Sequence, residues 1–269
     1  MQQQKISILG AGWLGASLAS YLKEKGYEVQ LSTASRERQQ ALQQEHNSVY
    51  QIKVQAETVT GDWEAFSQAE VLIINITPER SQPEKEQLAA LLPLIEASPI
   101  QKVLFVSSTS VYPNLNRVVR EGEGVENQNH ILYKSEQALQ QMEGVETTVL
   151  RLAGLIGGER HPGNFFRRSG TVKQGDAPVN LIHKVDCLQC IHQIIAQEYW
   201  GKVVNACADS HPLKMDFYPT AAASIGVAVP IVEQNGPVAY KIISNQKMKK
   251  ELGIQLQEPD LMALLEHWY

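Results

Sequence analysis

Three glycines near the start of the chain, Gly10, Gly12 and Gly15, have the spacing Gly-x-Gly-x-x-Gly. Glycines at these positions suit dinucleotide binding: the first permits a tight turn, the second lets the pyrophosphate approach the backbone, and the third lets a helix pack closely on a strand. Free N–H groups at the start of the following helix attract phosphates. Trp13 and Leu14 lie in the same segment and are predicted to line the cofactor site. A glycine-rich turn in an ordinary α/β protein is the alternative.

The elements that must position these glycines follow in the required order. An apolar strand is predicted at 5–9, a helix at 16–25 and a second strand at 28–31. A strand that runs into the glycines, a helix and a further strand form the context in which this fingerprint binds a dinucleotide.

The end of the second strand indicates which nicotinamide cofactor is bound. An acidic residue there usually binds the ribose 2′-hydroxyl of NAD, but residues 31–36 contain no carboxylate. Ser32, Thr33 and Arg36 instead suit a 2′-phosphate, because hydroxyls and a guanidinium donate hydrogen bonds to it. We therefore expect NADP in preference to NAD. The alternative to a role in cofactor binding is that Arg36 is simply a solvated residue in the first turn of the next helix.

Further strands and helices alternate through the first half of the chain. Strands are predicted at 49–54, 71–76, 103–106 and 147–151, and helices at 36–44, 62–68, 83–97 and 132–142. The apolar runs do not alternate with polar residues, which is typical of parallel strands covered on both faces. The fold class predicted is α/β, a Rossmann-type doubly wound parallel sheet.

The second half of the chain is less regular. Residues 154–178 are predicted to form a long loop, and strands at 179–182 and 202–205 flank a helix at 185–197. From residue 211 onward we expect two or three short helices and one strand, a small C-terminal α+β cap, with Pro219 in the first turn of a helix. The predicted division is 1–178 for the NAD(P)-binding part and 179–269 for the last sheet elements and the cap, or one integrated domain.

The composition excludes several classes of protein. The formal net charge is −5 and no basic run occurs, which argues against nucleic acid as a partner. No apolar run approaches the ~18 residues of a membrane span, and the first strand begins too early for a signal peptide. Three cysteines are an odd number for a disulfide framework, so we expect a cytoplasmic protein.

A second motif follows the strand at 103–106. The segment Ser107-Ser-Thr-Ser-Val-Tyr112 resembles the Ser-Ser-x-x-Val-Tyr-Gly motif of extended short-chain dehydrogenases/reductases, the family of nucleotide-sugar epimerases and dehydratases. Residues 119–121, 151–158 and 181–186 resemble further motifs of that family. The likeness is closest to an atypical bacterial branch labelled NAD-dependent epimerase/dehydratase-like, in which Arg-His-Pro-Gly, here 160–163, recurs.

The resemblance implies roles for individual residues. Ser108 would orient the substrate hydroxyl or carbonyl, and Tyr133 or His161 would handle the proton. Residues implied at the cofactor are Asn75, Thr77, Pro78 and Ser107, and residues implied at the substrate are Thr109, Tyr112 and Arg160. The function implied is that of an NAD(P)-dependent oxidoreductase or epimerase acting on a nucleotide sugar or another small polyhydroxylated molecule, with dimerisation left open.

The chain departs from the family at positions that matter for catalysis. The family's tyrosine has a lysine at i+4 that lowers the pKa of the phenol, but Gln137 stands there and Lys134 points elsewhere on the helix. Without that lysine the phenol is a poor base. Gly154 replaces an asparagine. A non-catalytic NADP-binding redox sensor or scaffold is therefore the alternative function, and the glycine spacing also suggests an oxidoreductase of the β-hydroxyacid type.

Other residues with chemical potential are better explained by structure. Cys187 and Cys190 have C-x-x-C spacing with His192 nearby, but no second ligand pair follows at zinc spacing. We expect a buried helix face there and no metal. His183 is as compatible with a structural role as with a catalytic one.

Overall fold

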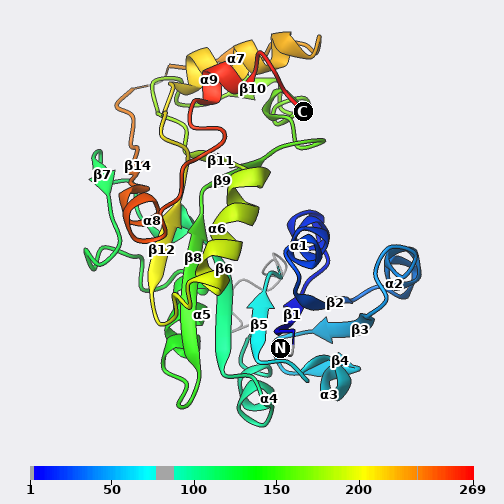
Figure 1. Cartoon of the computed structure of the whole chain (residues 1–269). Coiled ribbons are helices and arrows are strands. Elements are labelled where there is room, and N and C mark those ends of the chain that lie inside the picture. The colour runs from blue at the N-terminus through cyan, green and yellow to red at the C-terminus, as the bar shows by residue number, and fades with distance from the viewer. Residues whose placement is uncertain (1–2, 77–87, 235) are drawn as a thin grey trace. The chain divides into compact units, whose positions relative to one another are not determined.

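A computed structural model describes residues 3–76, 88–234 and 236–269 of the chain (Figure 1). It contains two compact units that interleave along the sequence. The first unit consists of Met1–Ser107, Asn127–Leu150 and Ile194–Val203, and the second of Ser108–Glu126, Arg151–Gln193 and Val204–Tyr269. The division near residue 178 that the sequence predicts stays a prediction.

An eight-stranded sheet has the order β12-β8-β6-β5-β1-β2-β3-β4. Its strands are β1 (Lys5–Leu9), β2 (Glu28–Thr33), β3 (Val49–Val54), β4 (Val59–Gly61), β5 (Val71–Ile74), β6 (Lys102–Ser108), β8 (Glu146–Leu152) and β12 (Val203–Ala206). The pairs β1–β2, β1–β5, β2–β3 and β5–β6 are parallel. The strand order reverses between β1 and β5, and ligands of doubly wound sheets bind at the carboxyl ends of the strands at such a reversal.

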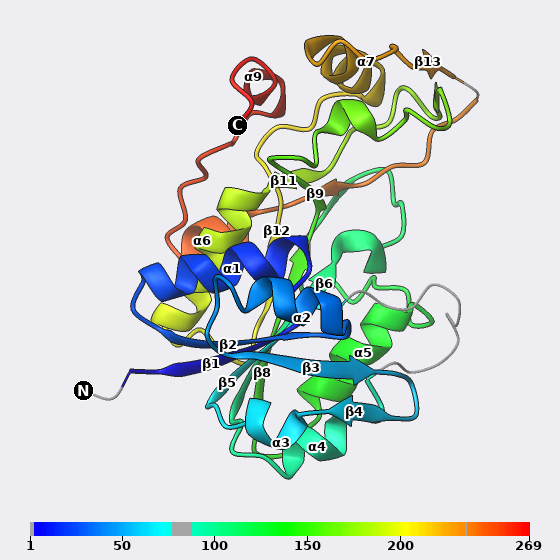
Figure 2. The same ribbon diagram turned by 90° about the vertical axis from the view of Figure 1, so that its right-hand side faces the viewer.

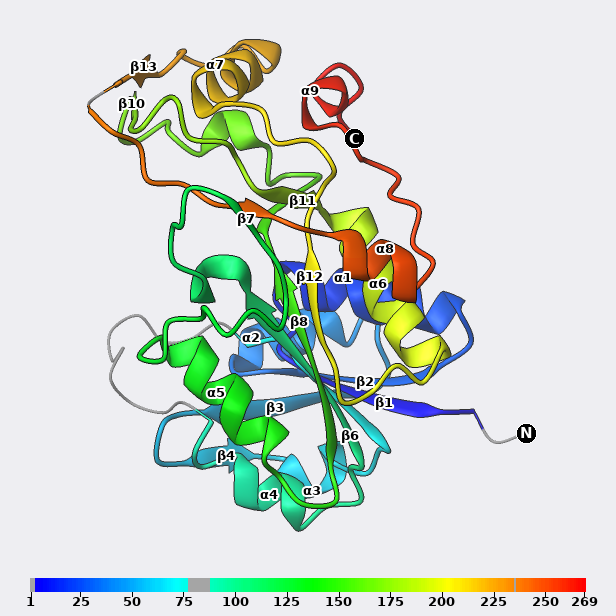
Figure 3. The same ribbon diagram turned by 90° about the vertical axis from the view of Figure 1, so that its left-hand side faces the viewer.

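Helices cover both faces of the sheet within the first unit. They are α1 (Trp13–Glu24), α2 (Arg36–Leu42), α3 (Trp63–Phe66), α4 (Leu92–Glu96) and α5 (Ile131–Gln140). Figures 2 and 3 show α1 and α2 on one face and α3, α4 and α5 on the other. The strand β5 is buried at all four positions because both faces are covered. The predicted Rossmann-type fold class is confirmed.

An edge strand and the start of a helix in the first half of the chain differ from the sequence prediction. The edge strand β4 was not predicted, because its residues are polar or half-exposed and it is defined by antiparallel pairing with β3. The helix predicted at 83–97 begins only at Leu92, and residues 83–87 lie outside the described part of the chain.

The second unit consists of short elements. They are the 3-10 turns η1 (Thr109–Val111) and η2 (Pro162–Asn164), the strands β7 (Val118–Val119), β9 (Gly154–Ile156), β10 (Thr171–Val172), β11 (Leu181–His183), β13 (Ile231–Val232) and β14 (Ile242–Ile243), and the helices α7 (Lys214–Ser224), α8 (Gln246–Glu251) and α9 (Leu261–Leu264). The helix α6 (Lys184–Ala196) begins in this unit. Parallel two-stranded pairs join β9 to β11, β10 to β13 and β7 to β14.

The prediction of one long loop at 154–178 was wrong. This segment contains β9, η2 and β10. Its strands pair with segments far along the chain, such as β10 with β13, and such long-range pairing is invisible in a local composition rich in glycine, arginine and proline.

The predicted helix start at Pro219 was also wrong. The helix α7 begins at Lys214, so the proline lies inside it. Phe217 and Ala221, one on each side of Pro219, are fully buried in the same hydrophobic cluster. Tertiary packing of this face therefore keeps the helix continuous despite the hydrogen bond that a proline removes.

Candidate functional site

The glycine segment forms a tight turn between β1 and α1, at the strand-order reversal. Gly10 has φ +112°, and a Cβ there would lie 2.6 Å from the carbonyl oxygen of Asn75. A Cβ on Gly15 would lie 2.0 Å from the carbonyl oxygen of Gly10. Both positions therefore require glycine because of the protein's own packing.

Gly12 differs from its two neighbours in the motif. Its φ of −71° suits any residue, and a Cβ built there meets no atom within 4 Å. Among the described residues nothing in the packing requires glycine at this position, whereas a pyrophosphate close to the backbone would. The open space beside Gly12 therefore fits a bound dinucleotide.

The start of α1 fits the same ligand. Gly12 is its N-cap and gives no side-chain cap to the helix, and the first turn carries no acidic residue. The helix has twelve residues, so its N-terminus presents N–H groups and a partial positive charge to an anion. Trp13, which is half-buried, and Leu14, which is buried, are the first residues of this helix.

Three residues predicted to touch the cofactor make hydrogen bonds within the protein, two of them to Gly10. The Asn75 side-chain amide donates to the Gly10 carbonyl at 3.2 Å, and the Ser32 hydroxyl accepts from the Gly10 N–H at 3.3 Å. The Thr33 hydroxyl accepts from the Ser35 N–H at 3.4 Å. Asn75 and Ser32 therefore hold the turn at Gly10, and the predicted contacts of all three residues with the cofactor stay predictions. Thr77 and Pro78 lie outside the described residues.

The end of β2 presents two arginines and one carboxylate. Arg36 is exposed at the start of α2, and its predicted role at the cofactor stays a prediction. Arg38, which sequence reasoning missed, donates from Nε to the Ala11 carbonyl at 2.9 Å and so touches the glycine turn directly. Between them Glu37 accepts a hydrogen bond from the Ser35 hydroxyl at 2.6 Å. That bond, together with the charge of Arg36, keeps the pKa of Glu37 below its ordinary value.

A buried serine–glutamate pair lies at the end of β6. The Ser107 hydroxyl donates to the Glu136 carboxylate at 2.5 Å, and Glu136 on α5 is fully buried. Ser107, predicted at the cofactor, is thus tied to this carboxylate. Tyr133 lies one turn earlier on α5 and is half-buried, and the Gln137 amide donates to Gln140 at 3.5 Å. Sequence reasoning missed Glu136 because nothing in the local pattern marks a glutamate as buried.

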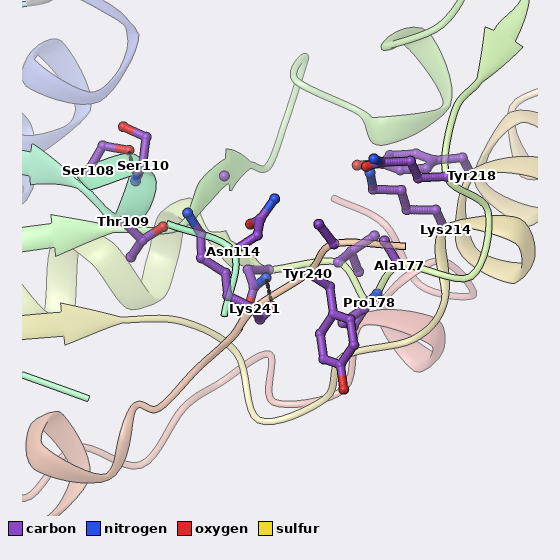
Figure 4. Close-up of a pocket in the computed structure, with 15 residues that line it drawn as sticks. Ser108, Thr109, Ser110, Asn114, Ala177, Pro178, Lys214, Tyr218, Tyr240 and Lys241 are labelled. Carbon is purple, nitrogen blue, oxygen red and sulfur yellow. Dashed lines mark hydrogen bonds between the residues drawn. The ribbon is translucent and has the colours of Figure 1, made fainter. Parts of the chain in front are cut away.

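The second unit contains a pocket of about 330 Å³ (Figure 4). Its lining is polar for the most part and comes from separate segments: Ser108, Thr109, Ser110, Asn114, Gly154, Gln174, Ala177, Pro178, Val179, Asn180, Lys214, Tyr218, Ala239, Tyr240 and Lys241. The structure thus brings two predicted residues, Ser108 and Thr109, into one pocket. The Ser108 hydroxyl accepts from the Ser110 N–H at 3.1 Å, so its own hydrogen remains for another acceptor. A Cβ on Gly154 would lie 2.6 Å from the end of the Leu181 side chain, so a larger residue here would require that side chain to move.

Two lysines in this pocket were missed by sequence reasoning. Burial lowers the pKa of both Lys214 and Lys241. The Lys241 ammonium donates to the Tyr112 carbonyl. No local signal distinguishes these lysines from the solvated ones, because their place in the pocket depends on the tertiary fold.

Tyr112, predicted at the substrate, has a buried side chain. It is 1% exposed, and its hydroxyl donates to Asn205 at 3.0 Å and accepts from Arg151. Arg151 also pairs with the Glu126 carboxylate, and both side chains are buried. Burial raises the pKa of Tyr112 to about 12. The side chain supports the segment that carries Ser108 and is not among the residues that line the pocket, and its predicted contact with a substrate stays a prediction.

Arg160 and His161 also lie outside the pocket lining. Arg160 is exposed and bridges to Gly157. His161 is buried against the Trp268 ring at 4.2 Å between centroids, and its Nδ1 accepts from the Gly163 N–H at 3.1 Å. Burial lowers its pKa, so the ring stays neutral. This environment favours a structural role over proton transfer, and His183, buried beside Trp268 and Tyr269, has a similar one.

The three cysteines, Cys187, Cys190 and Cys207, are free and buried. Burial raises the pKa of each thiol, which makes them inert. Within the described ranges no group of three His, Cys, Asp or Glu side chains could hold a metal ion. No helix in the part of the chain that the structure describes has the length and apolar character to span a membrane.

Comparison with known proteins finds relatives along nearly the whole chain. Protein YeeZ of Escherichia coli K12 is 32% identical over 271 residues, which cover 97% of this chain and 98% of the relative. Residues 6–107 match the family model of ketopantoate reductase PanE/ApbA. That match ends at Ser107, the last residue of the first segment of the first unit.

Solved structures share the fold. A short-chain dehydrogenase/reductase superfamily protein from Agrobacterium tumefaciens with bound NAD has a TM-score of 0.74 at 16% identity, covering 98% of this chain and 95% of its own. UDP-glucose 4-epimerase from Thermotoga maritima, with UDP-glucose, has a TM-score of 0.74 at 18% identity, covering 98% of each chain. At these identities the likeness is one of fold.

Proposed function

This chain belongs to the family of protein YeeZ, and on that premise we propose that it is an NAD(P)-dependent oxidoreductase or epimerase of the atypical extended short-chain dehydrogenase type. The observation that carries the proposal is the glycine turn. Gly10 and Gly15 are required by packing, whereas the open space beside Gly12 suits a pyrophosphate. The bound NAD of the Agrobacterium protein supports a nicotinamide cofactor.

Within this proposal the residues divide into two groups. The Gly12 backbone and the first N–H groups of α1 would bind the pyrophosphate, and the nicotinamide would supply a hydride donor or acceptor. In the pocket Ser108 would orient a substrate hydroxyl or carbonyl with its free hydroxyl hydrogen. Tyr133 would handle the proton, without the help of a lysine at i+4. The substrate would be a nucleotide sugar or another small polyhydroxylated molecule, as the UDP-glucose of the Thermotoga enzyme suggests.

NADP is the proposed cofactor in preference to NAD. Arg36 and Arg38 belong to the first turn of α2, which follows the end of β2, where a 2′-phosphate would bind. Glu37 works against this preference, because its carboxylate would repel a phosphate. The match to ketopantoate reductase covers only the first segment of the dinucleotide-binding unit, so it supports the cofactor and says nothing about the substrate.

A non-catalytic NADP-binding sensor is the second candidate function. The observation that favours it is Gln137, whose uncharged amide stands at the position where the family's catalytic lysine is expected.

The first experiment is a calorimetric titration of the purified protein with NADPH and with NADH. We expect binding of both, with NADPH the tighter ligand. Binding of neither dinucleotide would overturn the proposal, and a preference for NADH would overturn the NADP assignment.

The second experiment separates enzyme from sensor. In an enzyme Ser108→Ala should lose turnover on a panel of sugar nucleotides and small polyols while keeping its affinity for NADPH. Ser169→Ala is the matched control, because Ser169 is exposed and does not line the pocket. A protein that binds NADPH but turns over no member of the panel would favour the sensor.

A further inference from the structure

The pocket of the second unit is positively charged, and we propose that it binds an oxyanion of the substrate, a phosphate or a carboxylate group, through Lys214 and Lys241. The inference rests on the proposed function, because it takes this pocket to be the substrate's. It narrows the substrate to molecules that carry an anionic group.

The charge of the lining is the first observation. The pocket has two lysines and no aspartate or glutamate among its lining residues, although the whole chain has a formal net charge of −5. Other lysines of the described chain do have carboxylate partners: Lys102 pairs with Glu70 and Glu198, and Lys249 pairs with Asp209. No ion pair of the described residues involves Lys214 or Lys241.

Burial without a counter-ion is unfavourable for both ammonium groups. Desolvation is the cause of the lowered pKa of each lysine, and no carboxylate offsets it. A bound oxyanion would compensate this cost, since an opposite charge favours the charged form of a lysine. Lysine is a common ligand of phosphate for the same reason.

The two ammonium groups are held by different elements. Lys241 donates to the Tyr112 carbonyl, which orients its Nζ and leaves two further N–H donors. Lys214 is the first residue of α7 and lies one helical turn before Tyr218, so both point to one side of the helix. In the view of Figure 4, Ser108 and Ser110 lie at one side, Lys214 and Tyr218 at the other, and Lys241 between them. An anionic group near the lysines would leave the rest of the substrate to extend toward Ser108.

The rim of the pocket includes a strained residue. Gln174 has φ +56°, in the left-handed region that a residue with a side chain rarely adopts. The Gly175 N–H donates to the Glu233 carbonyl at 3.0 Å and the Ala177 N–H to the Gln174 carbonyl at 3.0 Å, which holds this turn in place. Strain that the surroundings enforce is concentrated at ligand sites, and here it coincides with the two lysines.

The test measures anion binding without any dinucleotide. Inorganic phosphate, pyrophosphate and malonate are titrated by calorimetry at constant ionic strength, so the three ligands distinguish a phosphate, a diphosphate and a carboxylate source. We expect Lys214→Met to weaken binding of the preferred anion by about tenfold or more. Lys173→Met is the matched control, because Lys173 is exposed in the adjacent loop and does not line the pocket. Equal affinity in wild type and Lys214→Met would overturn the proposal.

A second readout uses the unchanged protein, so it does not depend on the folding of a variant. The pKa values of Lys214 and Lys241 are followed by NMR of their ε-carbons, with and without saturating anion. The proposal predicts that both values rise when the anion binds. Unchanged values would overturn it. NADPH binding is measured separately. If the protein binds NADPH but no anion binds in the pocket, this inference is refuted and the proposed function is not.

Discussion

The glycine turn and the pocket of the second unit differ in which part of the chain forms the site. The glycine turn is one contiguous segment in which the backbone forms the site, and its specificity lies in the absence of side chains at Gly10, Gly12 and Gly15. The pocket is lined by side chains from several segments, between Ser108 and Lys241. The first region therefore depends on local sterics, and the second on contacts between segments far apart in the chain.

The contacts that hold the two regions in place also differ. The turn is fixed by backbone geometry and by the Asn75 amide. The segment that carries Ser108 is fixed by a buried polar network in which Arg151 contacts Tyr112 and Glu126. Buried charges are costly to disrupt, so the pocket should be more sensitive to a single distant substitution than the turn.

Among these variants, Arg151→Met should cause the largest loss of unfolding free energy, because it disrupts the buried network that supports the pocket. Removal of one partner of a buried ion pair costs about 3–5 kcal/mol, and both partners here are at most 6% exposed. Arg117→Met is the control, because its pair with Glu123 is exposed and should be worth less than about 1 kcal/mol. Urea unfolding gives both free energies. Similar small losses of unfolding free energy in the two variants would contradict a stabilising role of the buried network.

Gly15→Ala and Gly12→Ala should separate packing from ligand binding within the turn. The added methyl of Gly15→Ala would lie 2.0 Å from the Gly10 carbonyl oxygen, so we expect a loss of about 3 kcal/mol of unfolding free energy. The added methyl of Gly12→Ala would meet no atom of the described residues within 4 Å, so the variant should lose less than about 1 kcal/mol of unfolding free energy. Its affinity for NADPH should nevertheless fall sharply, as calorimetry would show. A Gly12→Ala variant with wild-type affinity would refute the pyrophosphate at this position.

The pH dependence of stability should identify a second buried carboxylate of the pocket's unit. Asp186 is fully buried and accepts from the Gln257 and Glu258 N–H groups. Burial raises its pKa from 3.8 to about 6, so the folded state binds the proton more tightly than the unfolded state. Its contribution to stability is therefore greatest below pH 4 and is lost as the pH rises through 6, by no more than about 3 kcal/mol.

Asp186→Asn isolates this contribution. The variant keeps every other titrating group, so the difference between the two unfolding free energies should change between pH 4 and 6 and be constant above pH 7. Parallel curves across the whole range would show that Asp186 has an ordinary pKa.

Arg38→Ala should have the smallest effect and tests the adenosine end of the turn. We expect the Kd of NADPH to rise about tenfold, which corresponds to the loss of one charge-assisted hydrogen bond, and the Kd of NADH to change much less. Arg36→Ala is the companion variant. A loss of NADPH affinity in Arg36→Ala but not in Arg38→Ala would support Arg36 alone as the phosphate ligand and leave Arg38 the role of holding the Ala11 carbonyl.

The sequence by itself determined the Rossmann-type sheet and the place of its glycine turn. Apolar runs such as Val71–Ile74 and the spacing of Gly10, Gly12 and Gly15 are local patterns, and local sterics and burial act on them directly. Only the tertiary structure decided that Tyr112 is buried and that Ser108, Lys214 and Lys241 share a pocket. Those residues are brought together by strand pairing and buried contacts between segments that are distant in the sequence. The energies of such contacts depend on which segments meet in space, and a local sequence pattern does not show this.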